Sequence, residues 1–105
     1  MKPGPFKDFV LDQLAALPGV EVRAMFGGHG LYCSEFFFGV MFKGRLFFKT
    51  SVSTRVDYAR RGMKPFRPSA KQSLKRYYEV PPDILEDRTA LVEWARQAIE
   101  VATAS

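Results

Sequence analysis

The apolar residues at the start of the chain recur with the spacing of one helix face. Their separations of four, four and three residues predict an amphipathic helix, which the Pro18-Gly19 pair is expected to end. Gln13 is expected on the solvent-facing side of this helix. The apolar stripe consists of Phe6, Val10, Leu14 and Leu17.

After residue 19 the pattern changes to alternation. Val20, Val22 and Ala24 alternate with charged residues, and this period of two predicts a strand. The Gly27-Gly28-His29-Gly30 run is interpreted as a turn or bulge that needs positive φ. Three further strands follow with links so short that they favour an antiparallel meander: residues 30–33, 36–42 and 45–50, joined at Ser34-Glu35 and Lys43-Gly44.

The predicted sheet is apolar on both faces in its middle. Helices must then cover both faces, or a partner must bury one of them. Because only three helices are available for this, a homodimer is one hypothesis. Regular alternation over residues 36–42 places Phe36, Phe38, Val40 and Phe42 on one face, and Phe37, Gly39 and Met41 on the other.

The second half of the chain predicts a short helix, a strand and a long helix. Ser51 or Ser53 can cap the short helix, and Gly62 stands where it ends. An extended segment at residues 64–68 and a strand at 74–80 follow. Asp83 to Glu86 has a capping-box pattern, and Asp87 can cap the last helix. The apolar face of the last helix comprises Leu91, Trp94, Ala95, Ala98, Ile99 and Ala102.

These elements predict an α+β fold. We expect a single domain over residues 1–105, with its core at about 6–102. A central antiparallel β-meander is flanked by an N-terminal helix, a short middle helix and a C-terminal helix.

Composition narrows the class of protein. The 105 residues are 47% hydrophobic and 26% charged, which is typical of a globular protein. No apolar run is long enough to cross a membrane, and no repeat is present. The single cysteine, Cys33, cannot form an internal disulfide, so a cytoplasmic location is expected.

Positive charge is concentrated in the middle of the chain. Residues 55–76 hold eight basic residues and one Asp, a net charge of +7, whereas the rest of the chain carries −2. Clustered positive charge attracts polyanions, although a solvated surface is the alternative interpretation. The candidate residues for contacting nucleic acid or an acidic protein are Arg60, Arg61, Lys64, Arg67, Lys71, Lys75 and Arg76.

The sequence predicts no catalytic, metal or cofactor site. His29 and Cys33 are the only residues of their types, and in an extended chain they stand about 13 Å apart, too far for a nucleophile and its base. A metal site would need more ligands. The carboxylates are expected at helix N-termini and on exposed helix faces, so no pair of them indicates acid-base catalysis. We therefore expect a protein that is not an enzyme.

Several short motifs, taken in order, resemble one known family over about residues 6–102. That family is the N-terminal domain of TfoX/Sxy-type competence regulators. The resemblance implies an α+β domain and a role in DNA uptake and transcription together with the cyclic-AMP receptor protein. Two-domain members carry a separate C-terminal helical domain, which these 105 residues do not include. The motifs are RAMFGGHGLY at 23–32, Phe37-Phe38-Gly39, Leu46-Phe47-Phe48-Lys49, Pro65-Phe66, Tyr77-Tyr78-Glu79-Val80-Pro81, and Leu91 with Trp94-Ala95 and Ala98.

Three functional hypotheses result. The first is a non-enzymatic regulatory binding module that acts in transcription or competence through protein or DNA contacts of the basic segment. The second is a homodimeric protein-interaction module built on the aromatic sheet, with no nucleic-acid role. The third is a small-ligand-binding protein whose pocket is lined by Tyr32, His29 or Tyr78.

Overall fold

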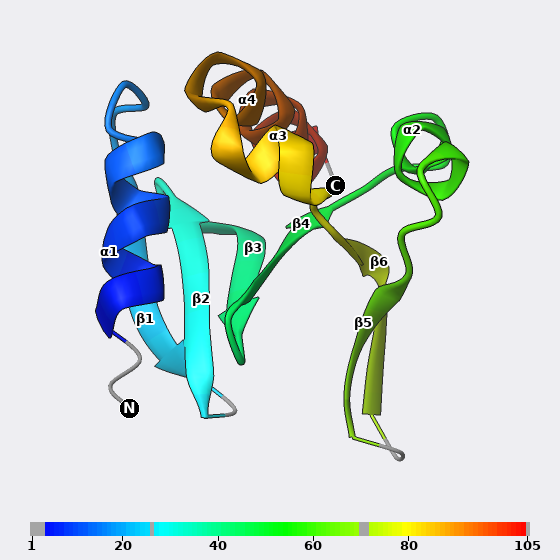
Figure 1. Cartoon of the computed structure of the whole chain (residues 1–105), viewed down its shortest axis with the longest axis horizontal. Helices are drawn as coiled ribbons and strands as arrows, with labels where there is room; N and C mark the ends of the chain where they lie inside the picture. Colours follow the sequence, from blue (N-terminus) through cyan, green and yellow to red (C-terminus); the bar gives the residue numbers. More distant parts are fainter. Residues whose placement is uncertain (1–3, 26, 70–71, 105) are drawn as a thin grey trace.

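The alternating segments form one six-stranded antiparallel sheet in the computed structural model, which describes residues 4–25, 27–69 and 72–104 (Figure 1). The strand order is β1-β2-β3-β4-β6-β5. The strands are β1 (Val20–Met25), β2 (Gly28–Cys33), β3 (Phe36–Phe42), β4 (Arg45–Lys49), β5 (Pro65–Ser69) and β6 (Gln72–Glu79). The helices are α1 (Gly4–Gln13), α2 (Arg55–Arg60), α3 (Pro82–Glu86) and α4 (Arg88–Ala104).

The predicted α+β fold and the meander are confirmed for β1 to β4, which pair in sequence order. Both short links have positive φ at their two central residues: 50° and 72° at Ser34 and Glu35, and 50° and 74° at Lys43 and Gly44. This is the type I′ geometry that suits the twist of a two-residue hairpin. The last two strands depart from sequence order: β6 pairs with β4, and β5 pairs only with β6 and forms an edge of the sheet.

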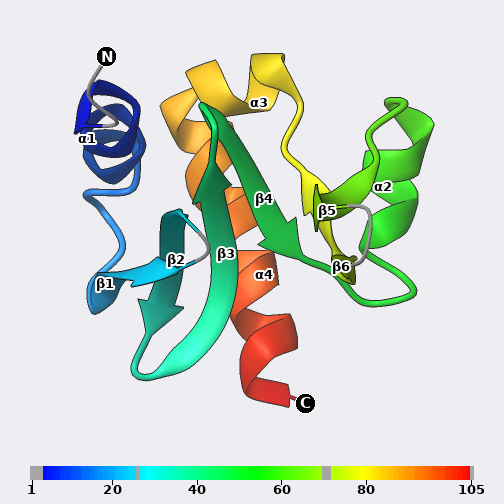
Figure 2. The same ribbon diagram turned by 90° about the horizontal axis from the view of Figure 1, so that it is seen from below.

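The helices gather on one face of the sheet (Figure 2). α4 packs across β3 and β4, and its small residues Ala95 and Ala98 are buried there. Asp87 caps α4 as predicted, because its Oδ1 accepts a hydrogen bond of 3.1 Å from the Ala90 backbone N–H. The main core lies between these layers and includes Val10, Leu14, Leu31, Phe38, Leu46, Phe48 and Leu91.

The regular alternation expected along residues 36–42 is wrong at one point. Leu31 pairs with Gly39, but Tyr32 pairs with Phe37, which leaves Phe38 as an extra residue on β3. Such a bulge exchanges the faces of the residues before it. Phe38 therefore joins the helix-side core, with its ring 5.9 Å from that of Phe48, while Phe37 turns to the other face.

The second face of the sheet is covered by the chain itself. In a flat sheet β3 and β5, three strands apart, would be separated by roughly 14 Å. The ring centroids of Phe42 and Phe66 on these strands are nevertheless 5.3 Å apart, and Phe66 lies 4.5 Å from Phe47. The sheet thus curls around a second core of Val40, Phe47, Phe66 and Tyr77. The two-sided apolar pattern does not call for a second copy, and the homodimer stays an untested prediction.

Gln13 corrects another expectation, because it is buried rather than exposed to solvent. Its Nε2 donates a hydrogen bond of 3.1 Å to the Leu85 carbonyl, and its Oε1 accepts one from Arg88 Nε at 3.4 Å. These bonds join α1 to α3 and α4. The capping box expected at residues 83–86 is also absent, since α3 begins after Pro81 without a side-chain cap.

The glycine-rich run is mostly strand rather than turn. Only Gly27 has positive φ there, and Gly28, His29 and Gly30 belong to β2. A Cβ at Gly28 would overlap the Met41 carbonyl oxygen, so close approach of two strands is what requires glycine. In the described residues no helix is long and apolar enough to span a membrane.

Candidate functional site

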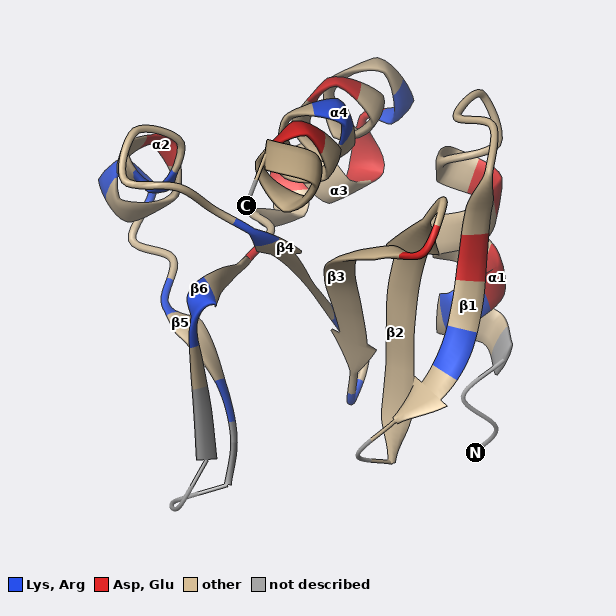
Figure 3. Cartoon of the chain, turned by 180° about the vertical axis from the view of Figure 1, so that it is seen from behind, with Lys and Arg blue, Asp and Glu red and all other residues tan. Residues whose placement is uncertain are grey.

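The candidate basic residues occupy one end of the molecule, formed by α2, β5 and β6 (Figure 3). They do not converge on one point. Arg60 is exposed on α2, Arg61 follows it, and Lys71 lies outside the described residues. The remaining four divide between two hollows and a shallow pocket: Lys64, Arg67, Lys75 and Arg76.

Arg61 is engaged within the fold. Its Nη1 lies 2.7 Å from Asp83 Oδ2, and its guanidinium lies 5.5 Å from the centre of the Trp94 ring. The hydrogen bond from Arg61 holds the pKa of the Asp83 carboxyl below its ordinary value. The side chain therefore ties the end of α2 to α3 and α4, and its donors are less available to a ligand.

Lys64 and Arg67 line a depression of about 420 Å³ together with two cations that the basic segment does not contain. These are Lys43 and Arg45, from the turn between β3 and β4 and the start of β4. Glu79 is an acid in the same lining, and its Oε1 lies 3.0 Å from Arg45 Nη1. We call this hollow the basic depression. The lining carries four positive charges and one negative charge.

The fold supports the basic depression with rigid elements. The type I′ turn presents Lys43, whose Nζ lies 5.3 Å from the centre of the Phe42 ring. The Glu79 backbone N–H donates to the Lys64 carbonyl at 3.1 Å, which joins the start of β5 to β6. Aromatic rings of the second core form the remaining wall: Phe42, Phe47 and Phe66.

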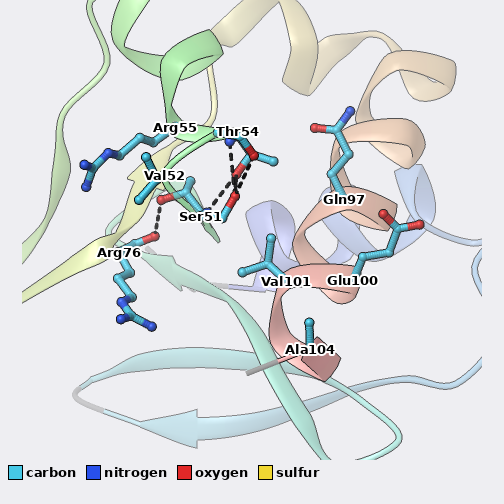
Figure 4. A pocket seen from close by; sticks show the side chains of 11 residues that line it. Ser51, Val52, Thr54, Arg55, Arg76, Gln97, Glu100, Val101 and Ala104 are labelled. Atoms are coloured by element: carbon cyan, nitrogen blue, oxygen red, sulfur yellow. Dashed lines mark hydrogen bonds between the residues drawn. The ribbon is translucent and has the colours of Figure 1, made fainter.

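Arg76 belongs to a different hollow, the α4 groove, which lies between residues 50–55 and the C-terminal part of α4 (Figure 4). Arg55 lines the same groove. The Thr50 backbone N–H and hydroxyl both donate to the Arg76 carbonyl at 2.7 Å. Lys75 lines a shallow pocket with Lys49, Tyr77 and Arg76, so Arg76 borders both this pocket and the α4 groove.

The family model of the TfoX N-terminal domain matches residues 12–102. The chain belongs to this family. A comparison with curated proteins gives no match. The recognised motifs lie on β1 to β4, on the paired strands β5 and β6, and on α4, so they mark the framework of this TfoX N-terminal domain.

The basic segment, residues 55–76, contains only two of the four cations that line the basic depression. Arg45 stands 34 residues before Glu79, and the pairing of β4 with β6 brings the two together. The one sequence signal was alternation, since Arg45, Phe47 and Lys49 fall on one face of a strand. That signal does not reveal which other strand lies opposite.

Tyr32, His29 and Tyr78, the residues expected around a small-ligand pocket, do not come together around one hollow in this TfoX N-terminal domain. Tyr32 packs on Phe37 at 5.1 Å on the curled face, whereas Tyr78 packs on Tyr58 at 6.0 Å on the helix side. His29 lines a third hollow beside α1. Within the described ranges no group of three His, Cys, Asp or Glu could hold a metal ion.

Proposed function

We propose that this TfoX N-terminal domain is a regulatory module that binds nucleic acid through the basic depression and does so without catalysis. The observation that carries the proposal is the meeting of Lys43, Arg45, Lys64 and Arg67 from two hairpins around one hollow. The single carboxylate in that lining, Glu79, is already paired with Arg45.

The chemistry of these side chains suits phosphate. Four cations against one acid leave a net charge of +3 in the lining, and cations that neutralise phosphates release counterions from nucleic acid. Arginine can donate two hydrogen bonds to one phosphate, and lysine supplies a compact charge. Such contacts position a duplex without reading its bases. Lys75 and Arg60, exposed at the same end, extend the positive surface.

The regulatory part of the proposal rests on family membership. The TfoX/Sxy role in competence and transcription involves the cyclic-AMP receptor protein, so a transcription regulator of that type is the proposed protein partner. An acidic surface on such a partner could use the same cations, because carboxylates and phosphates accept the same donors.

The test is fluorescence anisotropy of a labelled DNA duplex titrated with the full chain at several salt concentrations. We expect the logarithm of the binding constant to fall against the logarithm of salt with a slope of about −3.6 for four phosphate contacts. Arg67→Glu should weaken binding about tenfold and make the slope shallower by about 0.9, because one fewer phosphate is neutralised.

The matched control is Arg96→Glu. Both arginines are exposed and both variants change the net charge equally, but Arg96 stands on α4. Arg96→Glu should change the affinity less than about twofold. Equal losses in the two variants, or no binding at low salt, would refute nucleic-acid binding at the basic depression.

A further inference from the structure

The hollow beside α1 adjoins the turn between β3 and β4, as the basic depression does. Its volume is about 470 Å³, and residues 5–7, 27–29 and 41–44 line it. These residues belong to the start of α1, to Gly27 with the first residues of β2, and to the end of β3 with the turn after it. We call it the α1 hollow. The function proposed above does not use it.

The α1 hollow and the basic depression are contiguous, because Phe42 and Lys43 line both of them. The Lys43 ammonium lies 5.3 Å from the centre of the Phe42 ring, so the two side chains form one ridge between the hollows. In two perpendicular views the turn that carries Lys43 lies between the start of α1 and β5 (Figure 1, Figure 2). A polyanion that occupies the basic depression therefore reaches the α1 hollow by crossing this single ridge.

The charge of the α1 hollow has the same sign as that of the basic depression. Its lining contains Lys7, Lys43 and His29, and none of the described residues that line it is an Asp or Glu. The ion pairs found among the described residues involve neither lysine. Asp8 follows Lys7 in the sequence but is not part of the lining. Two ammonium groups without a neighbouring acid favour an anion, and lysine is a common phosphate ligand.

Two glycines leave the backbone of the α1 hollow accessible. Gly27 and Gly44 have φ of 79° and 74°, and a Cβ at either position would stand in open space. The pairing of β3 with β4 ends at Phe42 and Arg45, so the amides of Lys43 and Gly44 take no part in it. A ligand can therefore approach the main chain of the turn closely, because glycine puts no side chain in its way.

We propose that nucleic acid bound at the basic depression continues across Lys43 into the α1 hollow, where Lys7 and His29 contact its sugar-phosphate backbone. This inference rests on the proposed function and extends it by a second group of contacts beyond the β3–β4 turn. Lys7 contacts a phosphate, and the His29 ring donates a hydrogen bond to a phosphate or sugar oxygen. Such contacts read no bases, so they lengthen the bound segment without adding sequence preference.

The experiment is the anisotropy titration of the labelled duplex with the full chain and its Lys7 variants. Lys7→Glu should weaken binding about fivefold, because it replaces a phosphate contact by a repelling charge. Arg96→Glu on α4 makes the same change in net charge and should alter the affinity less than about twofold. Lys7→Arg should keep the affinity within about twofold, because a guanidinium also contacts phosphate.

A second variant and a second measurement guard against an effect on folding. Lys7 is half-buried, and Lys7→Met keeps an apolar stem there while it removes the charge. It should weaken duplex binding about threefold and leave the midpoint of urea denaturation unchanged. In ¹H–¹⁵N NMR spectra of the full chain, the duplex should shift the amide signals of Lys7, His29 and Gly44, but not those of residues 97–104.

The outcomes separate this inference from the proposed function. If Arg67→Glu weakens binding while Lys7→Glu and Lys7→Met bind as the unchanged chain does, nucleic acid stops at the basic depression and the inference is wrong. Equal losses in Lys7→Glu and Arg96→Glu would also overturn it, because overall charge would then explain the effect of Lys7. A duplex that does not bind even at low salt would refute both proposals.

Discussion

Arg45 Nη1 and Glu79 Oε1 lie 3.0 Å apart across neighbouring strands, although the two residues are 34 positions apart in the sequence. The pair is formed by the start of β4 and the end of β6. It places a negative charge inside the basic depression and occupies a donor of Arg45. Glu79 therefore holds the two strands together, and under the proposed function it would lower the affinity of this surface for phosphate.

Glu79→Gln should raise the affinity for a DNA duplex about threefold at low salt, because it removes the acid from the basic depression and frees Arg45. Anisotropy titration measures the change. Glu93→Gln, which removes an exposed acid from α4, is the control and should have little effect. Weaker binding by Glu79→Gln would contradict the assignment of phosphate to this hollow.

Two phenylalanines of β3 should differ in their contribution to stability, because Phe38 lies in the helix-side core and Phe36 stands at the start of the strand. Phe38 is fully buried, whereas Phe36 is 43% exposed. Phe38→Ala should lower the free energy of unfolding by about 3–5 kcal/mol, and Phe36→Ala by less than about 1.5 kcal/mol. Urea denaturation followed by circular dichroism measures both. Equal losses would contradict the burial of Phe38 in the helix-side core.

Gly28→Ala should destabilise the fold by about 2 kcal/mol or more, because the new methyl group would meet the backbone oxygen of Met41, which cannot rotate away. Gly27→Ala, one position earlier, has open space but positive φ, so it should cost only about 1 kcal/mol. The two midpoints of urea denaturation give the comparison. The reverse order would show that backbone conformation rather than strand contact selects glycine here.

The Asp83–Arg61 pair predicts a pH-dependent contribution to stability. Since the pKa of Asp83 is lowered in the folded chain, the contribution is full above the ordinary pKa of an aspartate and is lost as the pH falls through the lower folded value. Asp83→Asn should therefore unfold at lower urea than the unchanged chain at pH 7, and the difference should shrink towards pH 2. A difference that persists in strong acid would mean that the charge of Asp83 is not its source.

Local features of the sequence were enough to predict much of the fold. The links at Ser34-Glu35 and Lys43-Gly44 demand tight hairpins, and the face of α4 follows from its spacing. The place of β5 outside β6 depends on long-range pairing, which a local pattern does not encode. The bulge at Phe38 was hidden for a related reason: seven consecutive residues without a charge satisfy either register.

The candidate site was predictable in composition but not in geometry. Charge counting located Lys64 and Arg67, yet it grouped them with Arg61, which binds Asp83, and with Arg76, which lines another hollow. Lys43 and Arg45 lie outside the charged segment in the sequence. The curl of the sheet, rather than nearness in sequence, brings them beside Lys64 and Arg67. Gln13 shows the same limit for polar residues, since only the tertiary fold supplies its partners.

The edge position of β5 has a consequence for self-assembly. An exposed edge strand offers unpaired backbone groups to which a strand of another molecule can add. Two of the five residues of β5, Pro65 and Pro68, have no backbone N–H to donate, and Arg67 adds charge between them. The strand that brings Arg67 to the basic depression is thereby a poor template for intermolecular sheet growth. A positively charged edge can meet a polyanion while it resists fibril formation.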